Sequence, residues 1–205
     1  MFVHQSKVYV FGGAKEPPSL FKTKKRSDFE FNYDGSRRGG KYLLFQALNL
    51  QNLQWFAVKT DEIVPQVDDF AHYFDQDNNI LYIFGGYLNG YKSNILFKID
   101  IMTKCITILS ENIPENHPEA ANVPIQRTGA RIVYSPDQDC IYLFGGLSTL
   151  TTLNDMWKYD MMTNEWEKVR QLGRIPEPRC GHSLSILAQK IFLFGGLIEV
   201  TQESN

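Results

Sequence analysis

One short motif, Phe-Gly-Gly, occurs four times in this chain, and each copy closes an apolar segment. An apolar strand that recurs with the same ending indicates one structural unit used repeatedly, so the repeat constrains the fold more than any other feature. Two successive glycines suit a sharp backbone bend, or a close approach by a neighbour where a Cβ would clash. The glycines of the four copies are Gly12, Gly13, Gly85, Gly86, Gly145, Gly146, Gly195 and Gly196.

The third copy shows the whole unit most clearly. Its sequence predicts strands at 129–134, 141–144, 154–160 and 165–169, separated by polar turns. The second strand is apolar at every position, as in the other copies, which indicates a strand covered on both faces. Trp157 and Trp166 stand across a tight turn and can supply large apolar area between neighbouring units.

These residues resemble the kelch repeat. The matching features are Phe-Gly-Gly after an apolar strand, the segment Asn154 to Asp160, the turn from Thr163 to Trp166, and the segment Pro176 to Ser183. The resemblance covers nearly the whole chain apart from its loops. It implies an all-β, kelch-type β-propeller whose blades are four-stranded antiparallel sheets. The first and second copies lack the Gly-His pair and the tryptophan of the third strand.

The spacing of the motif predicts an incomplete ring. The four copies are 73, 60 and 50 residues apart, and a kelch repeat spans about 50 residues. We predict about three and a half blades: blade one at 1–58 with an inserted loop at 14–40, blade two at 70–109, blade three at 129–169, and a half blade at 181–205. Terminal blades of such an array expose apolar faces, so we expect completion by further blades, self-association or a complex.

The long connecting segments should gather on one face. In a four-stranded meander, the loops between strands two and three lie on the same side as the connections between blades. We call this side the loop face; it comprises 14–40, 59–69, 110–128 and 170–180, and we expect it to bind a protein partner. The first segment is basic and could recognise an acidic segment or a phosphate; alternatively it is a solvated insertion with no specific role. Its candidate contact residues are Lys22, Lys24, Lys25, Arg26, Arg37 and Arg38.

Three arginines, Arg127, Arg131 and Arg179, stand near the predicted starts of first strands. They could line a ligand-binding mouth of the central channel, or they could form buried salt bridges within the propeller. His182 is predicted to be a structural hydrogen-bonding residue of its blade.

Other motifs give little support for chemistry. The segment 35–41 fits GxxxxGK, but Tyr42 stands where a P-loop needs Ser or Thr, and no helix follows. Arg37 to Gly40 resembles an RNA-binding arm only faintly. The four histidines lack metal-ligand spacing and the three cysteines lack a CxxC pair, so we expect no metal and no cofactor.

The composition favours a soluble intracellular protein. The formal net charge of -2 gives no general attraction to nucleic acid or membrane, and no apolar run approaches the roughly 20 residues of a membrane helix. We expect a cytoplasmic location. The frequent use of Asn, Ile, Lys and Tyr resembles that of protist proteins, which makes cytoskeletal or ciliary assemblies candidate settings.

The resemblance implies a non-catalytic interaction scaffold or adaptor. One alternative is the substrate-recognition arm of a ubiquitin ligase or phosphatase whose other domain lies outside this chain. Another is a ligand-binding or oxidase-like propeller enzyme, which would need a polar cluster converging on the channel.

Overall fold

A computed structural model describes residues 1–12, 45–60, 64–65, 67–88 and 90–198, together with the backbone of β3 (Ser36–Arg37) and β4 (Gly40–Lys41). Within this part of the chain, regular structure is almost entirely antiparallel β-sheet, and the three-residue turn η3 (Ala120–Asn122) is the only helix. The predicted all-β class with four-stranded antiparallel sheets is therefore confirmed.

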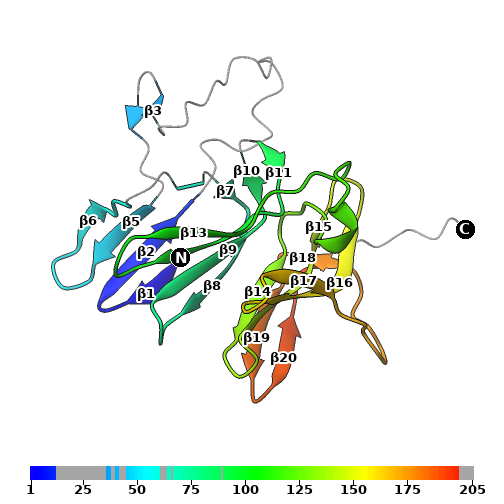
Figure 1. Cartoon of the computed structure of the whole chain (residues 1–205). Helices are drawn as coiled ribbons and strands as arrows, with labels where there is room; N and C mark the ends of the chain where they lie inside the picture. The colour runs from blue at the N-terminus through cyan, green and yellow to red at the C-terminus, as the bar shows by residue number, and fades with distance from the viewer. Residues whose placement is uncertain are drawn as a thin grey trace, which may run out of the picture.

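Three four-stranded sheets and one hairpin follow each other along the chain and lie side by side (Figure 1). Each sheet keeps its strands in sequence order. Blade one contains β1 (Phe2–His4), β2 (Lys7–Phe11), β5 (Phe45–Asn49) and β6 (Gln54–Ala57). Blade two contains β8 (Ala71–Asp75), β9 (Ile80–Phe84), β12 (Leu96–Asp100) and β13 (Ile106–Ser110). Blade three contains β14 (Arg131–Ser135), β15 (Cys140–Leu147), β16 (Thr152–Asp160) and β17 (Glu165–Lys168). The hairpin, which we call the half blade, contains β19 (Ser183–Leu187) and β20 (Lys190–Phe194).

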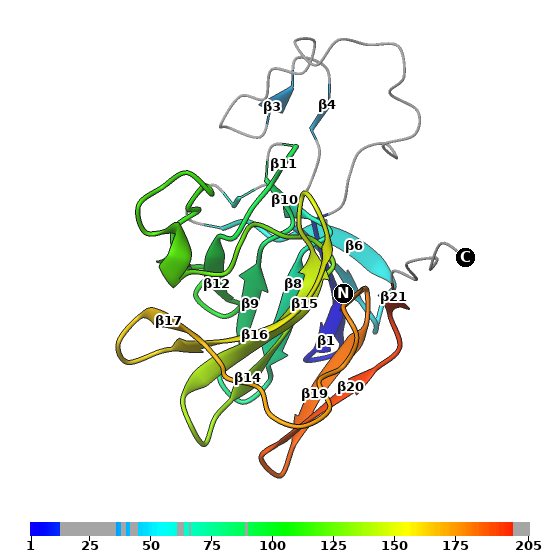
Figure 2. The same ribbon diagram turned by 90° about the vertical axis from the view of Figure 1, so that its right-hand side faces the viewer.

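The first strands of consecutive blades are neighbours. β14 contacts β8 of blade two on one side and β19 of the half blade on the other, an arrangement visible in Figure 2. Short ladders accompany these strands: β7 (Val67–Asp68) pairs with β10 (Tyr87–Leu88), which pairs with β11 (Tyr91–Lys92), and β18 (Arg179–Cys180) pairs with β21 (Leu197–Ile198). The described sheets thus form an open row of propeller blades.

The core consists of two apolar layers, one on each face of blade two. Along β9, Leu81 and Ile83 point into the layer shared with blade one, and Tyr82 and Phe84 point into the layer shared with blade three. All four side chains are buried. Because a strand directs successive side chains to opposite faces, a strand between two neighbouring blades must be apolar at every position. For β9, this confirms the interpretation drawn from the apolar second strands.

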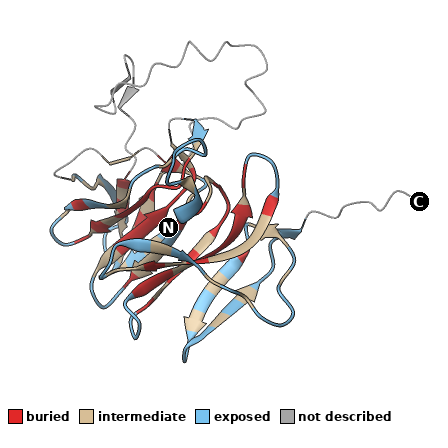
Figure 3. Cartoon of the chain, turned by 45° about the vertical axis from the view of Figure 1, so that its right-hand side comes forward, coloured by how far each residue is buried: buried red, intermediate tan, exposed pale blue. Residues whose placement is uncertain are grey.

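The half blade keeps the same sequence pattern but has only one covered face. In β20, Ile191 and Leu193 are partly buried against blade three, whereas Phe192 and Phe194 are 52% and 83% exposed. Figure 3 shows this hairpin largely in the colours of intermediate and exposed residues, in contrast to the buried strands of blade two. The apolar residues that would meet a fourth neighbour therefore face solvent.

In the first three pairs, the first glycine contacts the chain segment that leads into the next blade. A Cβ on Gly85 would lie 2.8 Å from the carbonyl oxygen of Arg127, and a Cβ on Gly145 would lie 2.7 Å from that of Arg179. Gly12 meets the Val67 carbonyl in the same way, at 2.7 Å. Real Cβ atoms do not come this close to a backbone oxygen, so these positions need glycine. We call this contact the glycine joint.

A second backbone contact links the same segments. Gly129 donates its N–H to the carbonyl of Asp69 at 3.1 Å, and Gly181 donates to the carbonyl of Gly129 at 2.8 Å. Asp69, Gly129 and Gly181 hold the same place before the first strands of blade two, blade three and the half blade, and all have positive φ. The blades are therefore joined at fixed spacing by backbone atoms, independently of the side chains around them.

Candidate interaction surface

The connection from blade two to blade three, 110–128, is held by Asn94, two residues before β12. Asn94 is buried, and its amide donates to the carbonyls of Ile113 and Pro124 at 2.9 and 2.8 Å. Its side-chain oxygen accepts from the Ile113 N–H at 2.8 Å, and its own N–H donates to Asn112 Oδ1 at 3.0 Å. A segment with little regular structure is thus fixed by one buried amide, in keeping with the need to satisfy buried polar groups.

The next connection, 170–180, uses the equivalent residue. Asn154 donates its side-chain N–H to the carbonyl of Pro176 at 3.2 Å, and Gln171 donates to the carbonyl of Asn154 at 2.8 Å. Both connections are therefore attached where a third strand begins. This is the end of the blade at which the loops between strands two and three also lie, so these two connections attach at the same end of their blades.

Neighbouring loops of this face are also tied to each other. Lys92 in β11 donates to the carbonyl of Leu147 at 3.1 Å and to that of Ser148. Two apolar side chains project beyond this contact: Tyr91 is 64% exposed and Leu150 is 89% exposed. The hydrogen bonds of Lys92 thus hold two neighbouring loops together, and these loops expose Tyr91 and Leu150. Exposed aromatic and apolar side chains of this kind are typical of the centres of protein interfaces.

The described part of the loop face carries acidic groups. Glu111, Glu115 and Glu119 are exposed along 110–128. Burial, and then the negative charge of Asp69, raise the pKa of the Asp68 carboxyl. In its described part, the loop face therefore carries these exposed acidic side chains as well as the exposed Tyr91 and Leu150.

The basic segment of the loop face lies outside the described residues. This applies to Lys22, Lys24, Lys25, Arg26 and Arg38, and also to Gly13 of the first glycine pair. Arg37 belongs to β3, whose backbone alone is described. Their predicted role in binding a partner stays a prediction.

Arg127 is a buried structural residue. Its guanidinium makes a two-fold contact with Asp155, at 2.6 and 2.8 Å, and donates to the carbonyl of Gly145 at 3.0 Å. Trp157 donates its indole N–H to the same carboxylate at 2.7 Å. Burial acts to raise the pKa of Asp155, but the hydrogen bonds and charge of Arg127 outweigh it, so the pKa is lowered. For Arg127, the structure therefore shows the buried salt bridge rather than a channel-lining side chain.

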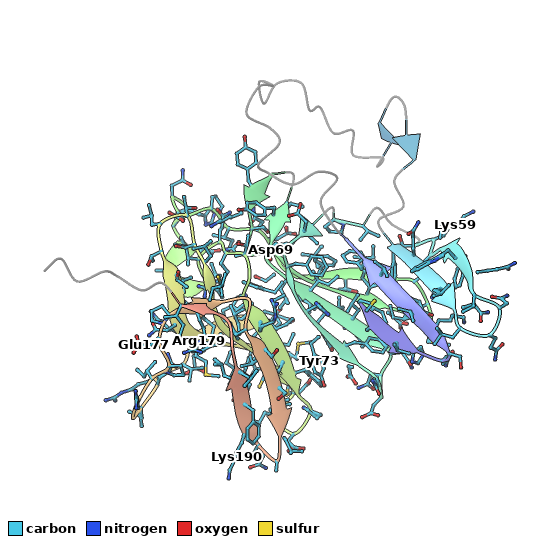
Figure 4. The ribbon with its side chains drawn as sticks, turned by 180° about the vertical axis from the view of Figure 1, so that it is seen from behind. Lys59, Asp69, Tyr73, Glu177, Arg179 and Lys190 are labelled. Carbon is cyan, nitrogen blue, oxygen red and sulfur yellow. The ribbon has the colours of Figure 1, made fainter. Side chains whose placement is uncertain are left out.

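The other two candidate arginines are more accessible. Arg131 donates to the carbonyl of Ala130 at 2.7 Å. Arg179 donates to the carbonyls of Glu177 and Gly195, both at 3.0 Å. Figure 4 shows Arg179 beside Glu177, away from the hairpin tip of the half blade that Lys190 marks. These contacts are all to backbone oxygens, so a ligand-binding role for either residue stays a prediction.

The two tryptophans lie between blades two and three. Trp157 is buried in the layer shared by the two blades. Trp166 packs edge-on against Phe84 of blade two, with 5.4 Å between ring centroids, and donates its indole N–H to Ser110 Oγ at 3.2 Å. Both residues therefore supply contact area between neighbouring blades.

The prediction that His182 is a hydrogen-bonding residue is wrong. Its side chain is 1% exposed, and neither ring nitrogen has a hydrogen-bond partner among the described residues. Instead its ring meets Phe144 edge-on, with 5.6 Å between centroids. Phe70 makes the same contact with Phe11 at 5.5 Å. His182 thus serves as an aromatic ring over a glycine joint, and burial followed by the charges of Arg131 and Arg179 lowers its pKa to about 4.

Three residues that organise the surface were not predicted from the sequence: Asn94, Lys92 and Asp155. Asn94 and Asn154 hold the same place in successive repeats, so the repeated asparagine was the available signal. Asp155, the partner of Arg127, lies 28 positions away in the sequence. The only signal was the alternation of side-chain direction along the third strand, which places Asp155 on one face of it. Lys92 gave no signal, because a single lysine in a loop is ordinarily solvated.

Within the described residues, no group of three His, Cys, Asp or Glu side chains could hold a metal ion. In the same part of the chain, no helix combines the length and hydropathy that crossing a membrane requires. The cysteines Cys105, Cys140 and Cys180 are free thiols.

Comparison with known proteins identifies the repeat. Residues 1–196 match the family model described as the KLHDC2/KLHL20/DRC7 Kelch-repeats domain. Tip elongation aberrant protein 3 of Schizosaccharomyces pombe is 32% identical over 71% of this chain, which corresponds to 12% of that protein. Kelch domain-containing protein 3 of Bos taurus is 30% identical over 57% of this chain and 31% of its own length.

A third relative differs in kind. A probable serine/threonine-protein kinase of Dictyostelium discoideum is 29% identical over 62% of this chain, but the match spans 9% of that protein. The chain therefore spans less than a third of the length of these three relatives.

Proposed function

Because this chain belongs to the kelch-repeat family, we propose that it is a non-catalytic interaction scaffold that binds a protein partner through its loop face. The proposal includes all four segments of that face, 14–40, 59–69, 110–128 and 170–180. We further propose a cytoplasmic setting, with cytoskeletal or ciliary assemblies as the specific candidates.

The observation that carries the proposal is the way Asn94 holds the connection 110–128. Four hydrogen bonds at one buried amide residue fix a surface segment that makes few ladder contacts of its own. A surface that is already ordered loses little conformational entropy when a partner binds. The exposed Tyr91 and Leu150 beside it offer apolar anchors of the kind that dominate binding energy.

The test is affinity purification with the full chain and two charge-altered variants. One variant neutralises Lys24, Lys25, Arg26, Arg37 and Arg38; the other changes Glu111, Glu115 and Glu119 to glutamine. A matched control changes Lys190 to glutamine at the opposite end of the half blade. We expect one of the first two variants to lose the main partner while the control retains it. Unchanged recovery with both loop-face variants would contradict the proposal.

A second candidate function is the recognition arm of a larger protein, such as a ubiquitin ligase or a phosphatase. The relevant observation is that the three relatives are much longer than the matched region, and one is named a probable kinase. Mass spectrometry of the native protein purified from its source tests this candidate. Peptides of a catalytic or ligase domain in the same polypeptide would support it, and a native mass of 23.6 kDa, that of the present chain, would exclude it.

A further inference from the structure

Three tyrosines pack together where blades two and three meet, toward the end of the blades opposite the loop face. Tyr73 in β8 is paired with Tyr82 in β9. The Tyr134 ring of β14 stacks on that of Tyr82 and also meets that of Tyr73, with 5.5 and 6.3 Å between ring centroids. Figure 4 shows Tyr73 nearer than Asp69 to the hairpin tip that Lys190 marks. Blades two and three each lie between other blades (Figure 1), so this group does not arise at either end of the row.

Three carboxylates lie around the tyrosine hydroxyls. Asp139, in the turn between β14 and β15, accepts a hydrogen bond from the Tyr134 hydroxyl at 2.7 Å. Asp75, in the matching turn of blade two, is buried and accepts from the backbone N–H groups of Asp77 and Asn78, at 3.1 and 3.3 Å. Asp77 and Asp139 are exposed. We call this group the tyrosine–aspartate cluster; it comprises Tyr73, Tyr82, Tyr134, Asp75, Asp77 and Asp139.

The Tyr82 hydroxyl lies in this cluster without a hydrogen-bond partner among the described residues. The residue is only 3% exposed. In the described part of the chain, the fully buried side-chain atoms that lack a partner belong to His4 and His182, so this hydroxyl must reach the surface. Burial, and then the charges of Asp75 and Asp139, raise the pKa of Tyr82 to about 12. The hydroxyl therefore stays neutral beside two carboxylates, and its oxygen can accept a hydrogen bond from a cation.

No counter-charge balances the cluster among the described residues. The ion pairs there join Arg127 to Asp155 and Lys158 to Asp160, and neither involves the cluster. Burial and then negatively charged neighbours raise the pKa of all three tyrosine hydroxyls, and no lysine or arginine contributes to these shifts. Carboxylates gathered without a counter-charge attract cations.

The chemistry of the cluster favours a guanidinium group over a metal ion. Within the described residues, no group of three His, Cys, Asp or Glu side chains could hold a metal. A guanidinium is always charged, carries five N–H donors in one plane and stacks on aromatic rings. Tyr73 and Tyr134 are half-buried, so part of each ring is accessible. Rings, hydroxyls and carboxylates together match the face and the edge of a guanidinium.

We propose that the tyrosine–aspartate cluster binds an arginine side chain of a protein partner, at the end of the blades opposite the loop face. The guanidinium donates to the exposed carboxylates of Asp77 and Asp139 and to the Tyr82 hydroxyl, and it lies against the accessible parts of the other two tyrosine rings. Asp75 holds the turn that carries Asp77. This site goes beyond binding at the loop face and does not depend on it.

A fluorescent peptide of three Arg-Gly repeats tests the proposal by titration into the full chain at low salt. Two variants remove the proposed contacts. The double variant Asp77→Asn, Asp139→Asn keeps an oxygen for the Tyr134 hydroxyl and should bind the peptide about 10-fold more weakly, because charge-assisted hydrogen bonds are lost. The variant Tyr82→Phe keeps the ring and should bind about 3-fold more weakly. Circular dichroism confirms that both keep their sheet content.

The matched control is the double variant Glu115→Gln, Glu119→Gln, which makes the same change in charge on the loop face. It should keep the affinity of the unaltered chain. A peptide of three Lys-Gly repeats should bind about 3-fold more weakly than the arginine peptide, since an ammonium group offers no planar surface or paired donors.

Three results would overturn the proposal. Equal weakening by the control variant would mean that the peptide responds to net charge or binds the loop face. Equal affinity for the lysine peptide would remove the assignment to arginine. Displacement of the arginine peptide by about 1 mM Ca²⁺ would show that the carboxylates hold a metal ion instead.

Discussion

The boundary between blades two and three and the outer face of the half blade are built from the same repeat, yet one is closed and the other is open. At the closed boundary, Tyr82, Phe84, Leu143 and Trp157 are buried in one layer, and the carbonyl of Arg127 occupies the joint of Gly85. At the open face, Phe192 and Phe194 are exposed, and nothing described lies within 4 Å of a Cβ built on Gly195. The half blade therefore has the apolar residues and the glycine of an interface between blades, but no described residue packs against them.

The difference also teaches what each part of the repeat contributes. The glycine bend forms without a neighbour, since Gly195 has φ of +69°, close to the +65° and +62° of Gly85 and Gly145. Arg179 also donates to its backbone acceptors, the carbonyls of Glu177 and Gly195, although it has no carboxylate partner among the described residues. Local sequence thus shapes the half blade, and only burial and the ion pair depend on the adjacent strand.

The largest effect should follow from breaking the complete ion pair. Changing Arg127 to valine leaves the Asp155 carboxylate buried without its partner, and this should lower the free energy of unfolding by about 3–5 kcal/mol. The same change at Arg179 should cost less than about 1 kcal/mol, because that guanidinium is accessible and unpaired with any described carboxylate. Urea unfolding measures both.

The double variant Arg127→Val, Asp155→Ile sharpens the comparison, since it copies blade two. There, Val67 stands at the place of Arg127 in the glycine joint, and Ile95 stands at the place of Asp155 in the aligned third strand. Both of these apolar side chains are buried in one core layer. The double variant should recover most of the lost stability, because well-packed apolar residues can replace a buried ion pair. A double variant as unstable as the single variant would show that the two positions are not matched as we describe.

A smaller effect is expected at the glycine joint. Both Gly85→Ala and Gly195→Ala place a Cβ on a residue with positive φ, which costs about 1 kcal/mol. Only the Cβ at position 85 would meet the Arg127 carbonyl, at 2.8 Å, and this overlap should add roughly 2 kcal/mol. Thermal unfolding of the two variants measures the difference. Equal destabilisation would mean that the joint at Gly85 yields easily or that Gly195 is covered.

The smallest effect concerns pH. Because the pKa of His182 is lowered to about 4, the unfolded chain binds a proton at this residue between pH 6.5 and 4 and the folded chain does not. Stability is therefore fully present above pH 6.5 and falls by on the order of 2 kcal/mol as the pH drops toward 4. The variant His182→Phe, which copies Phe70, should retain the ring contact and lose this part of the pH dependence. Identical pH profiles for the two proteins would contradict the assignment.

Much of the fold could be predicted because it depends on local pattern. The four glycine pairs located the second strands. Their uninterrupted apolar character correctly indicated cover on both faces for β9, but not for β20, where Phe192 and Phe194 are exposed. The role of Trp166 between blades also followed from its position after a tight turn.

The remainder depends on residues far apart in the sequence. His182 was misread because its hydrogen bonding is decided by its surroundings, and those are Phe144 and the Gly145 bend of the preceding blade. The ion pair of Arg127 required knowledge of how β16 crosses the end of β15. The hydrogen bond from the Asn94 amide to the Pro124 carbonyl joins residues 30 positions apart. No local sequence pattern indicates a contact over that separation.

Amide hydrogen exchange tests the central claim, that the half blade is an open copy of a closed interface. The measurement compares β9 with β20 in the full chain at low protein concentration. We predict that β20 exchanges about 100-fold faster than β9, because exposed hydrogen bonds and few buried apolar contacts lower the local opening free energy. Equal protection of β20 and β9 in the dilute chain would show that the half blade is already covered, and would contradict the account.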